Sequence, residues 1–409
     1  MKGDPRARLL LVLPNVPWPI RLNGVSLRFA PIVDYLAQRY ELDLLVLADE
    51  DAAPPPKGQF EQCHSLVIIK VPVSSLPAWL RKIKTALLSL APWGAPHGRL
   101  RYAQRRLEGA VSSYLKDSSY PVIIWATNHL ELACRIRRRY PQTRCVIDMT
   151  DSPTLFSLRD ASTNPVFRAL TKYSGWKWRR LERKARRAFD ATIYISSVDA
   201  HAVGSEDMAR VHVVPNGIFH ADAPALAKAS ASNKVIGFLG DMSYAPNISA
   251  ALRLAERIFP RIRSKLGDAT LLIIGRDPAP SIRRLSGDAI SVTGTVENIW
   301  PYIARANIFV FPMFEGSGLQ NKILEAMYAG VPVATTPIAA ASIGVTSGEQ
   351  LLVAESDAEI AAHAITLLCD PAYANRLATE ARTFVMREFS WPAILPRYAA
   401  IVANGTSGD

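Results

Sequence analysis

Lys322 and Glu325 stand three residues apart at the start of a predicted helix, within the stretch MFEGSGLQNKILEAMYAGVPV at 313–333. An apolar run at 308–312 predicts a strand before it, and a glycine-bearing loop joins that strand to the helix. Such a helix N-terminus presents backbone N–H groups and the positive end of the helix dipole, which favour an anion such as phosphate. Lys322 adds a charge, and Glu325 on the same face can accept hydrogen bonds from sugar hydroxyls. The pattern suits a nucleoside diphosphate, although strand–glycine–helix junctions also occur merely to turn the chain.

Apolar runs alternate with amphipathic segments along the whole chain. Because continuous apolar strands between helices are typical of parallel sheets covered on both faces, we predict an α/β fold. A stretch rich in Ala, Ser and Pro at 217–233 interrupts the alternation. We therefore expect Rossmann-like, doubly wound domains at 1–205 and 233–385, a linker at 206–232, and a helix in 386–409 that crosses back to the first domain. The predicted strands are 9–14, 42–48, 66–72, 122–126, 145–149, 191–196, 235–240, 270–275, 290–294, 308–312 and 331–335.

The composition indicates a globular protein. The 409 residues are 49% hydrophobic and 21% charged, which excludes a disordered chain. No apolar run is long enough for a transmembrane helix, and the apolar segment near the N-terminus is expected to be a buried strand rather than a signal peptide. The four cysteines have no metal-ligand spacing, and disulfides are not expected. A cytoplasmic protein is predicted.

The net charge of +12 lies in the first half of the chain. Residues 1–200 hold 31 Lys and Arg against 17 Asp and Glu. Two segments, 76–93 and 167–189, mix Trp and Leu with Lys and Arg, as helices at membrane interfaces do. The first half is therefore expected to meet an anionic membrane surface, on the inner face of the plasma membrane, with a solvated helix face as the alternative. Nucleic acid is not expected, because no recognition motif accompanies the charge.

Several motifs resemble those of the retaining glycosyltransferases of family 4, which have the GT-B fold of two Rossmann-like domains facing a central cleft. The motifs are GSGLQNKILEAMYAGVPVATTP at 316–337, VVPNGI at 213–218 and GDMSYAPNISAALRLAERIFPRIR at 240–263. The resemblance covers nearly the whole chain and is strongest in the second half. It implies transfer of a sugar from a nucleoside-diphosphate sugar to a glycan or lipid-linked acceptor in polysaccharide biosynthesis, with no metal or other cofactor.

The resemblance also implies a set of donor-binding residues. Glu325 matches the second glutamate of the family's paired-glutamate motif, which holds the ribose hydroxyls. Gly318 and Leu319 match the loop that meets the diphosphate or the donor sugar, and Val296 falls where the family contacts the base. The predicted donor set is Gly24, Gly240, Asn247, Arg276, Thr295, Val296, Ser317, Gly318, Leu319, Lys322 and Glu325.

The predicted catalytic residues are His129, Asp151 and Lys322. His129 and Asp151 end first-domain strands that face the transferred sugar in the family. A lone histidine is also often structural. Asp151 and the nearby Asp148 could equally bind a metal or cap the following turn.

The chain departs from the family pattern at two places. Nine residues rather than seven separate Glu315 from Glu325, so Ser317 takes the place of the first glutamate. The loop 240–247 lacks the usual cations, and Lys322, with Arg276 as a second candidate, is expected to supply the missing charge.

The implied chemistry is electrostatic stabilisation of the departing diphosphate. The resemblance implies that the acceptor hydroxyl attacks from the leaving-group face, with a phosphate oxygen taking its proton.

Three other functions stay open. A nucleotide-sugar epimerase would share the fold and the diphosphate site but would need general acid–base residues. A Rossmann oxidoreductase would carry G-x-G-x-x-G after its first strand, where this chain has PNVPWPIRLNG. A catalytically inactive scaffold at the membrane is the third.

Overall fold

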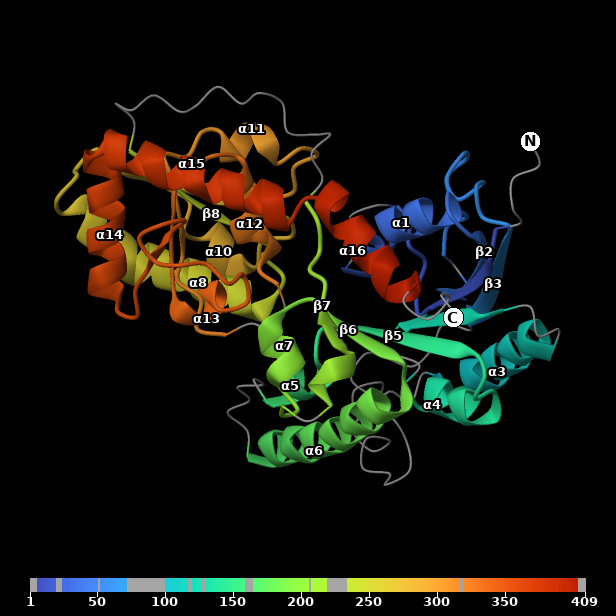
Figure 1. Cartoon of the computed structure of the whole chain (residues 1–409). Helices are drawn as coiled ribbons and strands as arrows, with labels where there is room; N and C mark the ends of the chain where they lie inside the picture. Colours follow the sequence, from blue (N-terminus) through green and yellow to red (C-terminus); the bar gives the residue numbers. More distant parts are fainter. Residues whose placement is uncertain are drawn as a thin grey trace. The chain divides into compact units, whose positions relative to one another are not determined.

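The computed structural model describes residues 6–19, 24–50, 52–71, 100–116, 120–126, 130–158, 165–205, 207–218, 234–315 and 319–403. The chain divides into two compact units (Figure 1), which are described separately. Unit 1 comprises Met1–Asn216 and Ile394–Asp409, and unit 2 comprises Gly217–Ala393. Unit 1 thus extends past the predicted boundary at 205, because the stretch assigned to the linker contains one more strand of its sheet. The rest of the predicted linker, 219–232, lies outside the described residues.

Unit 1 is a seven-stranded parallel sheet with helices on both faces. The strand order is β3-β2-β1-β4-β5-β6-β7. Its strands are β1 (Arg8–Leu13), β2 (Glu41–Asp49), β3 (Ser65–Val71), β4 (Val122–Ala126), β5 (Arg144–Thr150), β6 (Ala191–Tyr194) and β7 (Val211–Val213). Its helices are α1 (Gly24–Ala37), α3 (Leu100–Lys116), α4 (Leu130–Arg139), α5 (Pro153–Leu158), α6 (Pro165–Ala188) and α7 (Ser197–His201), with a short 3₁₀ turn at Met208–Arg210.

Unit 2 is built in the same way around a six-stranded parallel sheet, in the order β10-β9-β8-β11-β12-β13. Its strands are β8 (Val235–Leu239), β9 (Thr270–Ile274), β10 (Ile290–Val292), β11 (Ile308–Phe311), β12 (Val333–Thr335) and β13 (Leu352–Val353). Its helices are α8 (Ala245–Arg253), a π-helical turn (Leu254–Ile258), α9 (Phe259–Arg263), α10 (Pro280–Arg283), α11 (Trp300–Ile303), α12 (Asn321–Tyr328), α13 (Pro337–Ala340), α14 (Asp357–Cys369) and α15 (Pro371–Glu388).

Both sheets are doubly wound. Numbered within its own unit, each sheet has the order 3-2-1-4-5-6, and unit 1 adds a seventh strand at the edge. Ligands of such sheets bind beyond the carboxyl ends of the strands, where the strand order reverses. In unit 2 this switch point lies between β8 and β11, and in unit 1 it lies between β1 and β4. The predicted α/β class with two Rossmann-like domains is confirmed.

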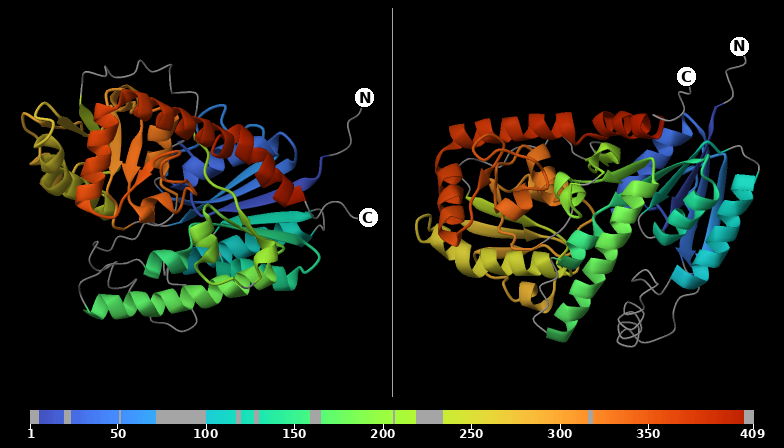
Figure 2. Two further views of the ribbon diagram at one scale, coloured as in Figure 1. Left: turned by 60° about the vertical axis from the view of Figure 1, so that its left-hand side comes forward. Right: turned by 60° about the horizontal axis from the view of Figure 1, so that its bottom comes forward.

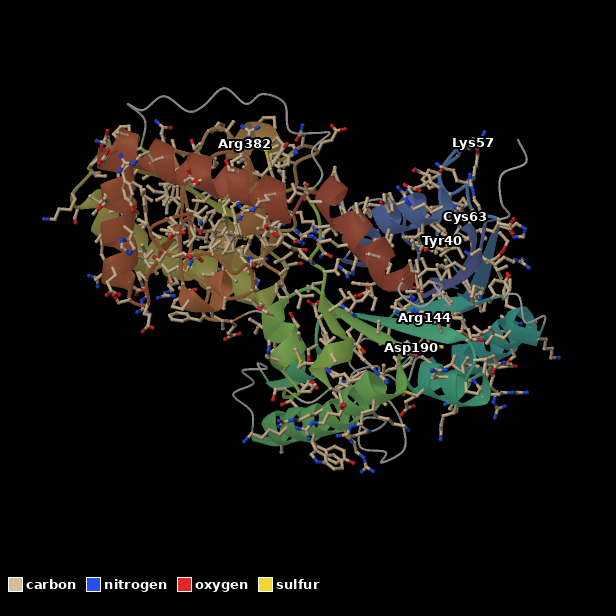
Figure 3. All side chains as sticks on the ribbon, viewed as in Figure 1. Tyr40, Lys57, Cys63, Arg144, Asp190 and Arg382 are labelled. Carbon is tan, nitrogen blue, oxygen red and sulfur yellow. The ribbon has the colours of Figure 1, made fainter. Side chains whose placement is uncertain are left out.

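The last helix, α16 (Trp391–Ala403), begins at the end of unit 2 and continues into unit 1. Within unit 1, Arg144 at the start of β5 (Figure 3) donates from Nη2 to the carbonyl of Ile401, 2.9 Å away. The Tyr398 ring lies 5.9 Å from the guanidinium of Arg28 on α1. These contacts fix the final turns of α16 on the face of the sheet that α1 covers.

The helix α6 covers the opposite face of the sheet of unit 1. It is 24 residues long, and it packs against α4 and α5. Figure 2 shows it at the periphery of this unit in both orientations. Within the described ranges, no helix is both long enough and apolar enough to cross a membrane.

The carboxyl ends of β8 and β9 approach each other so closely that glycine is required. A Cβ built on Gly275 would lie 1.8 Å from the carbonyl oxygen of Gly240. The two loops that follow are joined by backbone hydrogen bonds, from the N–H of Gly240 to Ile274 and from the N–H of Met242 to Arg276. This close approach sets the spacing at the edge of the sheet where a ligand would bind.

Replacing Gly275 by alanine should therefore destabilise unit 2. Overpacking a tight site usually costs 1–3 kcal/mol, and a backbone clash this severe should cost about 3 kcal/mol or more. Gly287→Ala is the control, because an added Cβ there meets no heavy atom of the described residues within 4 Å. Chemical denaturation of both variants measures the effect, and equal stabilities would contradict the close approach.

Candidate functional site

A hydrogen bond crosses the switch point of unit 2. Asn247 is the third residue of α8, which follows β8, and Lys322 is the second residue of α12, which follows β11. The ammonium of Lys322 donates to Oδ1 of Asn247 at 2.6 Å. The structure thus brings together two predicted donor residues from segments 75 positions apart.

The N-terminus of α12 is available to an anion. Its N-cap, Gln320, makes no side-chain capping bond, and the first turn holds no acidic residue. The N-cap of α8, Tyr244, also makes no side-chain capping bond. The first N–H groups of a helix need acceptors, and in α12 those of Asn321 and Ile323 donate to the carbonyls of Leu319 and Gln320. The N–H of Lys322 lies between them and is the one that an anion at this edge would meet.

Burial disfavours the charged form of Lys322. Burial lowers its pKa to about 8, and the neighbouring Glu325 opposes that shift. Glu325 lies one turn further along α12 and is half-buried. A cation near a helix N-terminus is unfavourable by itself, so an anion bound there would stabilise the charged lysine.

Asn247 is held in one orientation. Its amide Nδ2 donates to the carbonyl of Asp241 at 3.0 Å, which leaves Oδ1 for Lys322. A Cβ on Gly240 would lie 2.9 Å from Nδ2 of Asn247. Gly240 therefore allows the amide to lie directly over the end of β8.

Arg276 is already engaged by a carboxylate. It follows β9, and its Nε and Nη2 lie 2.9 and 2.8 Å from one oxygen of Asp241. Burial raises the pKa of Asp241, but hydrogen bonds from Ser243 and Arg276 outweigh it and hold that pKa below its ordinary value. Because Asp241 offsets its charge, Arg276 supplies less of the missing positive charge than Lys322.

The loop after β10 carries two predicted donor residues, Thr295 and Val296, of which Val296 is predicted to contact the base. Gly294 has φ +70°, which turns the chain just after β10. Thr295 is exposed and accepts a hydrogen bond from the N–H of Asp277 at 3.4 Å, while Val296 is half-buried.

Arg253, which supports the start of the loop before α12, is not among the residues predicted from the sequence. Arg253 is buried, and its Nε lies 2.6 Å from Asp357. Its Nη1 donates to the carbonyl of Pro312 at 3.0 Å, and the guanidinium lies 3.6 Å from the ring centroid of Phe314. The signal was present in the sequence, because an arginine interrupts the apolar stripe of α8.

Hydrogen bonds also join the start of this loop to residues at the end of β12. The hydroxyl of Thr335 donates to the carbonyl of Phe311 at 2.8 Å, and that of Thr336 donates to Met313 at 2.7 Å. Both threonines are buried. The side chains of Arg253, Thr335 and Thr336 thus satisfy three successive carbonyls where the loop leaves the sheet.

In unit 1, a buried arginine organises the end of β5. Nε of Arg28 donates to Asp148 at 2.9 Å, and Nη1 donates to the carbonyl of Val214 at 3.0 Å and to Asn216 at 2.9 Å. Asp148 also accepts from the N–H of Thr150 at 2.9 Å, so it closes the turn after the strand. Arg28 is not among the predicted site residues, because its partners lie more than a hundred residues away along the chain.

Asp151 is the titratable group of this turn. Burial raises its pKa to about 7, the carboxylates of Asp199 and Asp148 act in the same direction, and Arg28 opposes them. A carboxyl group that titrates near neutrality can exchange a proton or donate a hydrogen bond. Among the described residues, no group of three His, Cys, Asp or Glu side chains is arranged to hold a metal.

Comparison with known proteins finds a family similarity in unit 2. Residues 233–370 match the family model "Glycosyl transferases group 1". The part of the chain that resembles this glycosyltransferase family therefore lies within unit 2. The chain as a whole has the GT-B fold, since solved GT-B structures cover nearly all of it.

Two of these structures and one relative define the likeness. Sucrose-phosphate synthase from Thermosynechococcus elongatus is 15% identical with a TM-score of 0.70, over 99% of this chain and 100% of that one. HepE of Anabaena, solved with UDP and glucose, is 16% identical with a TM-score of 0.62, over 96% of this chain and 99% of that one. A Klebsiella pneumoniae protein, called an uncharacterized 44.6 kDa protein in the cps region, is 20% identical over 94% of this chain and 96% of its own length.

Unit 2 holds most of the predicted donor residues, at one edge of its sheet. Leu319 is buried just before α12, and Glu325 lies on that helix. Gly24 begins α1 in unit 1, and Asp151 also belongs to unit 1. His129, Ser317 and Gly318 lie outside the described residues.

Lys322 should make nucleotide binding depend on pH. The lysine is charged below its pKa of about 8 and loses its charge above it. The affinity for a nucleoside diphosphate should therefore fall by about tenfold between pH 7 and pH 9. At a pH one unit above its pKa, a group is only about one tenth protonated.

Calorimetry with UDP on three proteins measures this dependence. Lys322→Arg should bind with little pH dependence, because arginine stays charged, and it also corrects for titration of the nucleotide itself. Lys322→Met should bind weakly at both pH values. A wild-type profile that matches the arginine variant would contradict the role of Lys322.

Proposed function

We propose that this protein transfers a sugar from a nucleoside-diphosphate sugar to a glycan or lipid-linked acceptor in polysaccharide biosynthesis, with retention at the anomeric carbon. The observation that carries the proposal is the bond from Lys322 to Asn247 at the uncapped N-terminus of α12. It lies within the residues that match the glycosyltransferase family model.

The chemistry needs negative charge to be stabilised as it moves onto the departing diphosphate. Lys322 and the first N–H groups of α12 are fixed before the reaction begins, so they stabilise that charge without reorganising. Glu325 can accept hydrogen bonds from ribose hydroxyls without repelling the diphosphate directly. The acceptor hydroxyl attacks from the leaving-group face, and a phosphate oxygen takes its proton.

The relatives support this choice of substrates. The HepE structure holds UDP and glucose, and the Klebsiella pneumoniae relative is named for its place in a cps region. A donor of the UDP type and a polysaccharide product are therefore the first to test.

A nucleotide-sugar epimerase of the same fold is the second candidate. Asp151 favours it, because a carboxyl group with a pKa of about 7 can act as a general acid or base. The two functions differ in their products. An epimerase inverts one carbon of the sugar and leaves the nucleotide attached, whereas a transferase releases the nucleoside diphosphate.

A panel of UDP-, GDP- and TDP-sugars decides between these functions. We expect slow release of the nucleoside diphosphate from one donor, and faster release when an oligosaccharide or lipid-linked acceptor is added. The assay should give the same rate in excess EDTA, because Lys322 and α12 supply the charge that a metal would otherwise provide. Loss of activity in EDTA that Mn²⁺ or Mg²⁺ restores would overturn the metal-independent route, and an inverted sugar on intact nucleotide would favour the epimerase.

Glu325→Ala should weaken binding of the ribose specifically. Loss of a hydrogen bond to a charged group costs about 1.5–3 kcal/mol. The wild type should prefer UDP over its 2′- or 3′-deoxy analogue, and the variant should lose that preference. Calorimetry on the four protein–ligand pairs gives the coupling between the carboxylate and the hydroxyl. Glu380→Ala on α15 is the control, an exposed helical glutamate of the same unit. A coupling energy of zero would contradict a role of Glu325 in binding the ribose.

A further inference from the structure

One face of α6 presents basic and aromatic side chains at helical spacing. We call it the α6 stripe: Lys172, Trp176, Arg179, Arg180, Arg183, Lys184 and Arg187. Successive members are one to four residues apart, so they lie along one side of the helix. Six of these seven residues, all except Lys172, also line a common pocket together with Ala188. The stripe contains no acidic residue.

The single carboxylate of α6 points the other way. Glu182 is fully buried and accepts hydrogen bonds from the hydroxyls of Ser152 and Thr154, at 2.9 and 2.8 Å. The N–H of Thr154 donates to it at 2.8 Å as well, and the Tyr194 hydroxyl lies 3.2 Å away. Since these contacts fix the rotation of the helix, the stripe must face away from the sheet.

Within the described residues, the positive charge of the stripe is little compensated. Arg187 pairs with Asp207 at 3.0 Å, and Arg183 donates to the carbonyl of Val203 at 3.0 Å. The described ion pairs include none from Lys172, Arg179, Arg180 or Lys184. A face that is only solvated usually mixes both signs of charge, which this one does not.

An aromatic pair lies among these cations. Trp176 is 56% exposed, and its ring stacks on Tyr173 with centroids 6.1 Å apart. The guanidinium of Arg180 lies 6.0 Å from the Trp176 ring. Exposed tryptophan among Arg and Lys is characteristic of helices that lie at the headgroup level of a bilayer, where the ring leaves water while the cations meet phosphate.

We propose that the α6 stripe docks unit 1 on the surface of a bilayer that contains anionic phospholipids. Charge complementarity selects the anionic headgroups, and Trp176 selects a bilayer over a soluble polyanion. Glu182 joins the docked helix to the turn that carries Asp151, so the bilayer contact and that turn form one block. The second basic segment predicted from the sequence, 76–93, lies outside the described residues. The proposal is independent of the sugar transfer.

Co-sedimentation of the full chain with vesicles tests the proposal. Binding should be strong to vesicles that contain phosphatidylglycerol, weak to pure phosphatidylcholine, and lower at high salt, because the Debye length is about 8 Å at physiological ionic strength. Arg179→Glu with Arg180→Glu should weaken binding about tenfold or more, since each basic residue near an anionic surface contributes appreciably. The matched control is Arg261→Glu with Arg263→Glu on α9, which makes the same change in net charge on exposed arginines of unit 2.

A separate variant tests the aromatic contribution. Trp176→Ser should reduce the binding that persists at high salt, where attraction between charges is screened. All three variants should keep the wild-type melting temperature, because the replaced side chains are exposed.

The possible outcomes are distinct. Equal loss in the α6 and α9 variants would mean that net charge alone drives binding, and it would overturn the proposal. Equal binding to neutral and anionic vesicles, or to neither, would also overturn it. Binding to a soluble anionic glycan or to single-stranded DNA that Trp176→Ser leaves unchanged, without binding to vesicles, would assign the stripe to a soluble polyanion instead.

Discussion

The candidate donor site of unit 2 depends on an electrostatic conflict at the start of α12. Lys322 brings a cation to the positive end of a helix dipole, which by itself raises the energy of the folded state. The amide oxygen of Asn247 accepts a hydrogen bond from the ammonium and the carboxylate of Glu325 favours its charge, whereas burial disfavours the charge and lowers the pKa of Lys322 to about 8. An anion with two or more oxygens resolves the conflict, because it can meet the ammonium and the helix N–H groups together. The surrounding glycines and the supported loop base hold these groups in place before any ligand arrives.

Buried charges elsewhere in the protein are of a different kind. Arg28 with Asp148, and Arg253 with Asp357, are paired at short range, and each arginine also donates to backbone carbonyls. Removing one partner of such a pair leaves an uncompensated charge and costs about 3–5 kcal/mol. These pairs therefore hold loops to the sheets, whereas Lys322 and Asp151 keep perturbed pKa values near neutrality. The contrast separates charges that are paired within the architecture from charges whose pKa values lie near neutrality.

Most strands could be predicted because they are continuous apolar runs, as in β1, where five successive residues are buried. The edge strands β7 and β13 could not, because they have three and two residues and are partly exposed. The site was partly predictable for a similar reason. Lys322 and Glu325 lie three residues apart on one helix, so local spacing reveals them. The partners of Arg28 and Arg253 lie 120 and 104 residues away, and the neutralisation of Arg276 by Asp241 spans 35 residues. Spacing along the chain carries no information about such pairs until the strand order is known.

The α6 helix shows how one buried residue can determine a surface. Its sequence predicts an amphipathic helix, but nine of its residues are basic and they are not confined to one side. Arg186, for example, is buried and donates to the carbonyl of Gly204 at 3.0 Å. Burial of Glu182 against Ser152 and Thr154 decides which of the remaining cations face outward. The same carboxylate accepts hydrogen bonds from the residues that follow Asp151, so a change in the rotation of α6 would break those bonds. The direction of the stripe and the geometry of the Asp151 turn are therefore set by one interaction.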